Sequence, residues 1–325
     1  MDILKNSTNV SLRIIDYYRN WGPVYEGLRI VLNSRGINFT PQYLSGISGE
    51  AMSFYRTGFD NEYRNTAEEL IDFIKSLGFK PERLNPSNEP DDIQKAIDAI
   101  IEEIDNGRAL LLWNAFTLCE WDVICGYNKK TREFLGRGSM VGKDDFATED
   151  WTRAFKSTIS CKSKGAIFIK QNKISYDPNQ LELQAMKNGI AHCKNEDDLP
   201  EDMGGYKGFI KWAENFGDPE RLPSRKDQYN MAVYASLHST AYMFLKEIMG
   251  KYPKAQDNIS RAAFLFREEA SYLQQVFKLV FNNWQLPKRI NPDTNEAASE
   301  LLYNAAENYK NAFSELQKVV DILED

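Results

Sequence analysis

The sequence predicts an α+β protein, with a mixed first domain over residues 1–177 that carries a small antiparallel sheet and an all-α up-and-down bundle over residues 178–325. Up to about Lys173, short apolar runs of strand length alternate with helical periods and frequent Gly and Pro. Beyond Asp177-Pro178 the strand-like runs stop, and apolar residues recur at steps of three and four. A length of 325 residues is also typical of two domains of about 150 residues each.

Helix start and stop signals divide the first part of the chain. Pro23 occupies a first helical position, where its missing N–H does no harm, and Gly36 stands where a left-handed residue would end the helix. Similar signals predict a series of helices, namely over residues 23–35, from Thr40-Pro41, from Thr66 to Gly78 and from about Asp91 to Gly107. These helices supply the α component of the first domain.

Short apolar runs bounded by polar residues predict the strands. The runs are Ala109–Trp113, Trp121–Tyr127, Arg132–Leu135 and Gly165–Ile169. The second and third runs flank a four-residue polar turn, residues 128–131, so we expect them to form a hairpin. The acidic segment from Asp144 to Trp151 is predicted to be a loop.

The second half repeats a helical period. Apolar stripes or cap signals indicate helices at Gln180–Ala191, Tyr206–Phe216, after Ser224, and over Ile259–Val280 and Ala298–Leu323. The apolar steps of the long helices average 3.5 residues, the period of left-handed antiparallel packing. Proline and glycine near residues 250–253 and 286–287 allow the chain to reverse. An up-and-down bundle is therefore expected.

Charge and composition exclude several classes of protein. The net charge is −7, and basic residues are dispersed, so nucleic-acid binding is not expected. No apolar run has the length of a signal peptide or a membrane span, which favours a cytoplasmic protein without a membrane partner. Neither a GxxxxGK[ST] nor a GxGxxG loop occurs, so we expect no nucleotide, and no cofactor is indicated.

Histidine and cysteine are scarce. His192 ends a predicted helix, where a cation is favoured, so a capping or surface role is expected. His238 lies on an apolar stripe and is predicted to be a buried histidine with a hydrogen-bond partner on a neighbouring helix. The cysteines show no CxxC pair or metal spacing, and we expect reduced, inert thiols and no metal site at Cys119, Cys125, Cys161 and Cys193.

Two further patterns leave alternatives open. Glu120 and Asp122 share one face of a predicted strand. They could act as an acid–base pair, although carboxylates at a strand end are more often simply solvated. Residues 46–49, Gly-Ile-Ser-Gly, indicate either a tight turn or a close approach of the backbone to another group.

Taken in order, several motifs resemble a known family. They are Pro23 with Leu28 and Gly36, the Gly-Ile-Ser-Gly segment within Tyr43–Met52, Asn106–Leu111, and the Glu120–Asn128 hairpin. This order resembles the papain-like fold of double-glycine cysteine peptidases that process bacteriocins. More closely, it resembles the N-terminal domain of butirosin-biosynthesis-protein-H-like proteins. The second half of those proteins is also helical, and its opening Gly, Tyr and Trp pattern is similar to Gly205-Tyr206 and Trp212. The resemblance covers most of residues 21–285.

The resemblance implies a cysteine nucleophile at the start of the first helix and a histidine at the start of a central strand. These positions fall at or near Pro23 and Glu120, so the dyad is missing. The implied cleft would place Tyr25 and Glu26 opposite Glu120 and Asp122. The remaining residues expected to line it are Trp113, Asn114 and Trp121, with Ser48 and Glu50 as a wall.

Carboxylates and aromatic rings in one cleft suit an amine through charge and cation–π attraction. We therefore expect a catalytically degenerate papain-like protein that binds a small amine-containing ligand or peptide, in a biosynthetic or peptide-modification pathway. One alternative is an acyltransferase that uses Glu120 or Asp122 as base and takes its acyl group from an acyl carrier protein. Another is a scaffold that forms a homodimer through the bundle.

Overall fold

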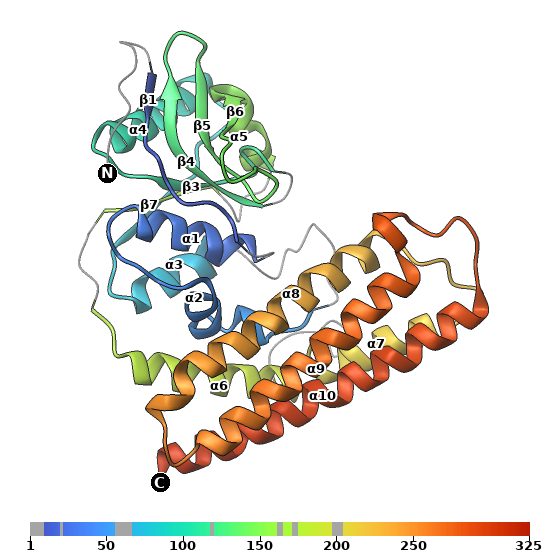
Figure 1. Cartoon of the computed structure of the whole chain (residues 1–325). Coiled ribbons are helices and arrows are strands. Elements are labelled where there is room, and N and C mark those ends of the chain that lie inside the picture. The colour runs from blue at the N-terminus through green and yellow to red at the C-terminus, as the bar shows by residue number, and fades with distance from the viewer. Residues whose placement is uncertain are drawn as a thin grey trace. The chain divides into compact units, whose positions relative to one another are not determined.

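The computed structural model describes residues 10–19, 22–55, 67–117, 120–160, 165–170, 175–196 and 204–325 (Figure 1). The chain divides into two units. The first consists of Met1–Pro41 and Asp60–Tyr176, and the second of Gln42–Phe59 and Asp177–Asp325. All strands of the described residues belong to the first unit, and the second is helical, which confirms the predicted α+β class.

The first unit is built on a seven-stranded sheet in which every described pair is antiparallel. The strand order is β2-β7-β3-β4-β5-β6, and β1 pairs with β4. The strands are β1 (Val10–Leu12), β2 (Pro81–Leu84), β3 (Leu110–Trp113), β4 (Trp121–Asn128), β5 (Glu133–Arg137), β6 (Ala147–Asp150) and β7 (Ala166–Ile169). The predicted small antiparallel sheet and the β4–β5 hairpin are confirmed.

Helices cover the sheet of the first unit (Figure 1). They are α1 (Pro23–Asn33), α3 (Ala67–Ser76), α4 (Pro90–Asp105) and α5 (Trp151–Ser160). Residues of α4 and α5 share one apolar core with Leu110, Leu112 and Ile124 of the sheet. Side chains alternate along a strand, so Leu111 faces the opposite side, where it lies against Gly27 of α1. The sheet is therefore packed between helices.

Gly27 allows α1 to lie directly on the start of the central strand β4. A Cβ atom here would lie 2.8 Å from the Tyr18 hydroxyl and 3.4 Å from the Trp121 carbonyl oxygen. A residue with a Cβ atom would have to displace the Tyr18 hydroxyl, so glycine permits the closest approach. The first turns of α1 and the beginning of β4 are consequently neighbours.

The loop predicted around Asp144–Trp151 is wrong for most of its residues. Residues 144–146 do lie in a loop, but residues 147–150 form the edge strand β6, paired with β5, and Trp151 begins α5. The Ala-Thr-Glu-Asp strand has no apolar alternation because none of its side chains is fully buried. The strands β1 and β2 were not predicted either, because their mostly half-buried side chains give no apolar alternation in the sequence.

The second unit is a bundle of helices, as predicted. Its elements are α2 (Pro41–Ile47), the short 3₁₀ helix η1 (Glu50–Met52), α6 (Pro178–Cys193), α7 (Gly205–Phe216), α8 (Arg225–Ile248), η2 (Met249–Lys251), α9 (Gln256–Val280), η3 (Asn282–Trp284) and α10 (Pro292–Glu324). Helices α8, α9 and α10 pack consecutively, and α6 and α7 lie along α10 (Figure 1). None of the described helices is long and apolar enough to cross a lipid bilayer.

Residues 42–59 pack with the helical unit, whereas the predicted domain over residues 1–177 included them. Gly46 lies inside α2 at a close approach, because a Cβ atom there would overlap the Phe244 ring of α8. Gly49 adopts the left-handed conformation, with φ of 82°, and begins η1. Both interpretations of the Gly-Ile-Ser-Gly segment thus apply, each to a different glycine.

Candidate functional site

Glu120 and Asp122 are both buried in the first unit. Their exposed fractions are 8% and 0%, so the expectation that they are simply solvated is wrong. Glu120 directly precedes β4, and Asp122 is its second residue. The alternation along the strand puts both on one face, as predicted. Burial follows because the β3–β4 connection and the residues after β5 close over this face.

Asp122 is bound through only one of its two carboxylate oxygens. Its Oδ2 accepts hydrogen bonds from the backbone N–H groups of Phe116 (2.6 Å) and Thr117 (2.9 Å). Its Oδ1 is buried and has no hydrogen-bond partner among the described residues. Burial raises the pKa of Asp122 to about 7, despite the opposing effect of hydrogen bonds from the Phe116 and Thr117 backbones and from the Thr117 side chain.

Glu120 forms a pair with a hydroxyl group. Ser139, just after β5, donates a hydrogen bond from Oγ to Glu120 Oε2. Burial raises the pKa of the Glu120 carboxyl, and the Ser139 hydrogen bond opposes that rise. The Glu120 charge is also close enough to Asp122 to add to the upward shift of the Asp122 pKa. The two carboxyl groups therefore form one electrostatic cluster.

Tyr18 lies at the same cluster. Its hydroxyl donates a 2.6 Å hydrogen bond to the Trp121 carbonyl oxygen. Burial, followed by the charges of Asp122 and Glu120, raises the Tyr18 pKa well above its usual value. Tyr18 therefore stays a neutral phenol and supplies no positive charge. No described Lys, Arg or His is among the main causes of the pKa shifts of the two carboxyl groups, whereas the Arg29 charge acts on Tyr18 at the same cluster.

Glu26, predicted to face the same cleft, is already neutralised. Its carboxylate forms two hydrogen bonds with the Arg29 guanidinium, at 2.6 and 2.9 Å. Arg29 also contacts Asp16 at 2.7 Å, and the side chains of Glu26 and Arg29 are only 0% and 1% exposed. Through these contacts the buried Glu26–Arg29 pair links α1 to Asp16 in the segment that precedes the helix. The structure gives Glu26 a structural partner, and its predicted ligand role remains a prediction.

The predicted aromatic and amide residues lie around the same strands. Trp113 and Trp121 are directly paired across β3 and β4, and their rings meet edge to face at 5.6 Å. Asn114 turns the chain after β3 with φ of 58°, and its N–H donates a 2.7 Å bond to the Glu120 carbonyl oxygen. Tyr25 packs edge to face on Phe73 of α3, at 5.1 Å. All except Tyr25 adjoin the carboxyl pair in the sheet.

Ser48 and Glu50 belong to the second unit. Ser48 Oγ donates to the Ser45 carbonyl oxygen at 2.9 Å, and Ser45 Oγ donates to Glu50 at 3.2 Å. These bonds hold the turn between α2 and η1. The prediction that Ser48 and Glu50 form a wall of the cleft remains a prediction.

The two histidines are both buried in the second unit. His238 is confirmed as a buried histidine with a partner on a neighbouring helix: its Nδ1 lies 2.5 Å from Glu269 Oε1 on α9, and its Nε2 lies 3.1 Å from the Ser53 carbonyl oxygen. The surface role of His192 is wrong. It is 4% exposed, and its Nε2 lies 2.7 Å from the Phe54 carbonyl oxygen and 3.2 and 3.1 Å from the backbone nitrogens of Phe54 and Gly205.

The described thiols are not activated. Cys125 and Cys193 are free and buried, and burial raises the pKa of each to about 12. The expectation of inert thiols is confirmed for these two, while Cys119 and Cys161 lie outside the described residues. Among the described residues, no group of three His, Cys, Asp or Glu side chains could hold a metal ion.

A basic cavity of about 460 Å³ in the first unit was not found from the sequence. It is lined by Arg13, Arg35 and Arg108, from three segments with no local pattern in common. Arg13 bonds the Ser34 carbonyl oxygen, and Arg108 pairs with Glu103 at 2.6 Å. Burial and the two neighbouring guanidinium groups lower the Arg35 pKa to about 10. These arginines join β1 to the ends of α1 and α4.

The positions that the resemblance assigns to a cysteine and a histidine hold neither. Pro23 begins α1, and Glu120 stands just before β4. Comparison with protein-family models, with characterised proteins and with solved structures finds no match for this chain.

Proposed function

We propose that this chain is a catalytically degenerate, papain-like member of the butirosin-biosynthesis-protein-H-like family that binds a small amine-containing ligand or peptide. The proposed site consists of Glu120 and Asp122 in the first unit. One observation carries the proposal: the two carboxyl groups are buried together, and Asp122 Oδ1 has no hydrogen-bond donor within the described chain.

An ammonium group supplies what this cluster lacks. A buried acceptor without a donor costs roughly 1–3 kcal/mol, and more when it is charged. A primary ammonium offers three N–H donors and one positive charge, which together satisfy the free oxygen and offset the repulsion between the two carboxylates. Glu120 keeps 8% exposure and bonds the half-buried Ser139, so Glu120 is the more exposed carboxyl and marks the side from which a ligand would enter.

The proposal implies a direction for the pH dependence of binding. Asp122 must release its proton to attract a cation, and its pKa in the free protein is about 7. A primary amine stays protonated well above that pH. Amine affinity should therefore rise as pH increases from 5 to 7, by up to about tenfold per unit, and level off above pH 8.

The test is a calorimetric titration of the full chain at pH 8 with benzylamine, 1,4-diaminobutane and an aminoglycoside, each compared with its N-acetylated form. We expect at least one free amine to bind and its acetylated form not to bind. Glu120→Gln and Asp122→Asn should each weaken that binding by about tenfold or more. Glu102→Gln, which removes an exposed carboxylate of the same unit, is the matched control and should leave the affinity unchanged.

Three outcomes would contradict the amine site. They are amines that bind no better than their acetylated forms, equally strong binding in the two site variants and the wild type, and a loss of affinity in Glu102→Gln as large as in the site variants. Thermal unfolding with and without each amine provides an independent readout, because a ligand of the folded state raises the midpoint by mass action.

The Glu120–Ser139 pair also supports a second candidate, the acyltransferase. A carboxyl group whose pKa is raised by burial holds a proton more strongly and is a better general base than an ordinary glutamate. Glu120 would then take a proton from the amine as its nitrogen bonds to the acyl carbon, and return that proton to the sulfur of the carrier protein as the acyl–sulfur bond breaks, without a covalent cysteine intermediate. Glu120→Gln should lower transfer from an acylated carrier protein by at least about 100-fold. Unchanged turnover would reject this role.

A further inference from the structure

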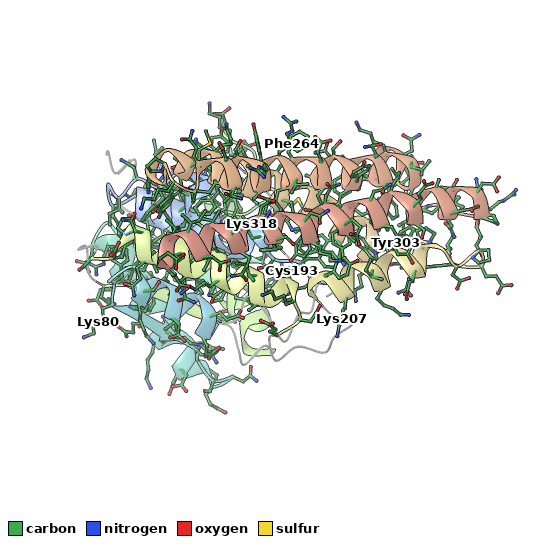
Figure 2. All side chains as sticks on the ribbon, turned by 90° about the horizontal axis from the view of Figure 1, so that it is seen from below. Lys80, Cys193, Lys207, Phe264, Tyr303 and Lys318 are labelled. Atoms are coloured by element: carbon green, nitrogen blue, oxygen red, sulfur yellow. The ribbon has the colours of Figure 1, made fainter. Side chains whose placement is uncertain are left out.

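The second unit contains a cavity of about 530 Å³ between α6, α7 and α10. This volume lies within the range of small-molecule sites, roughly 300–1,000 Å³. Cys193 of α6, Lys207 of α7 and Lys318 of α10 all line the cavity, and Figure 2 shows all three on one face. None of its lining residues belongs to the first unit, so it is independent of the carboxyl pair.

The floor of this cavity is apolar. Ile190 and Cys193 of α6 and Phe313 of α10 are 5%, 4% and 3% exposed. The Cys193 thiol has a pKa of about 12 because it is buried, so it stays neutral and behaves as a small hydrophobic group. The floor therefore favours hydrocarbon contact and offers no nucleophile.

The rim of the cavity is cationic. Lys194, Lys310 and Lys318 stand at its edge, and all three are exposed. Lys194 donates a 3.1 Å hydrogen bond to the neutral Gln317 side chain, and the Lys310 ammonium lies 4.8 Å from the centre of the Tyr206 ring. Lys318, in contrast, pairs with Glu315 at 2.5 Å. Positive charge gathers here on a chain whose net charge is −7.

We propose that this cavity binds an amphipathic anion, a hydrocarbon chain that ends in a carboxylate. The chain lies on Ile190, Cys193 and Phe313, and the carboxylate lies between the ammonium groups of Lys194 and Lys310. Charge complementarity selects the head group: a carboxylate gains two ammonium partners, whereas a cationic head would be repelled. Hydrophobic contact with the floor supplies most of the affinity.

The preference for a carboxylate head group is tested by titrating the full chain with dodecanoate below its micelle concentration. Dodecyltrimethylammonium and 1-dodecanol, with the same chain and a different head, are the controls. Dodecanoate should bind saturably at one site, and each control at least tenfold more weakly. Raising the salt concentration should weaken dodecanoate binding and leave dodecanol binding unchanged, because only the former depends on charge.

Variants locate the site. The double variant Lys194→Gln/Lys310→Gln should weaken dodecanoate binding by roughly fivefold to tenfold, in line with two solvent-exposed ion pairs. Lys278→Gln, which removes an exposed lysine of α9 outside the cavity, is the matched control and should change nothing. Loss of affinity only in the double variant supports the rim assignment.

A blocking variant makes the test independent of charge. Ser314 is exposed on α10 and lines the cavity, so Ser314→Trp should fill it without disturbing the core. We expect dodecanoate binding to fall at least tenfold while the unfolding midpoint stays within about 2 °C of the wild type. Unchanged binding in Ser314→Trp, or equal binding of the cationic amphiphile, would overturn the proposal.

Discussion

Asp122→Asn is expected to stabilise the ligand-free protein by up to about 4 kcal/mol at pH 8 and to leave its stability nearly unchanged at pH 4. Asp122 has a pKa of about 7 in the folded chain, against an ordinary value of 3.8. Each unit of pKa corresponds to about 1.4 kcal/mol, which gives the expected size of the effect. An Asn side chain retains an oxygen that accepts from Phe116 and Thr117, but it carries no charge.

The sign follows from proton binding. Between pH 4 and 7 the folded chain holds the Asp122 proton, whereas the unfolded chain releases it. The stability that this proton contributes is complete below pH 4, is lost as pH rises through about 7, and is constant above that. Asn cannot titrate, so the difference between variant and wild type should grow over the same interval.

Urea unfolding of both proteins at pH 4, 6 and 8 measures this difference directly. Asp98→Asn, at an exposed carboxylate of α4 that accepts from Gln94, is the matched control and should show no pH-dependent difference. A variant that is destabilised at pH 8, or whose stability differs from the wild type equally at all three values, would contradict the assignment of a buried, unsatisfied carboxyl.

The same residue connects stability to the proposed function. A carboxyl held in an unfavourable environment is retained at binding sites because the ligand relieves the strain on its charge. An amine bound at Glu120 and Asp122 should lower the pKa of Asp122 and recover part of the stability lost above pH 7. Asp122→Asn therefore stabilises the free protein and removes the further stabilisation by amines, two opposite effects of one substitution.

The sequence was sufficient to place Glu120 and Asp122 on one face of a central strand, because alternation is a local property. It could not show their burial. That depends on Ser139, 17 or more residues further along the chain, and on the backbone of residues 116–117, which folds back over the strand. Long-range closure of this kind leaves no period in the sequence, so exposed carboxylates were the natural expectation.

The two histidines show the same limit. His238 lies on a regular apolar stripe, which was enough to predict its burial and its partner on another helix. His192 ends α6 in a helix without such a stripe, and its burial depends on residues 53–55, which lie far away in the sequence. The packing of residues 42–59 on the bundle was missed for the same reason, since their partners begin more than 100 residues later.

Phe54→Ala is expected to destabilise the second unit by about 3–5 kcal/mol. Phe54 is fully buried, and its ring stacks on Phe209 at 4.3 Å and lies 5.6 Å from Trp212 and 4.8 Å from Tyr234. Removing the ring leaves a cavity among three aromatic side chains that the surrounding helices cannot fill. The loss should appear as a lower urea midpoint of unfolding.

The matched control for this substitution is Phe264→Ala in α9, because the Phe264 side chain is 50% exposed and projects away from the bundle in Figure 2. We expect that variant to stay within about 0.5 kcal/mol of the wild type. Phe54→Ala should also speed amide hydrogen exchange between residues 43 and 55, since Phe54 anchors this segment together with the bonds from His238 to the Ser53 carbonyl and from Tyr309 to the Met52 carbonyl. A loss of stability as small as that of Phe264→Ala, with unchanged exchange, would show that residues 42–59 are not held by this aromatic cluster.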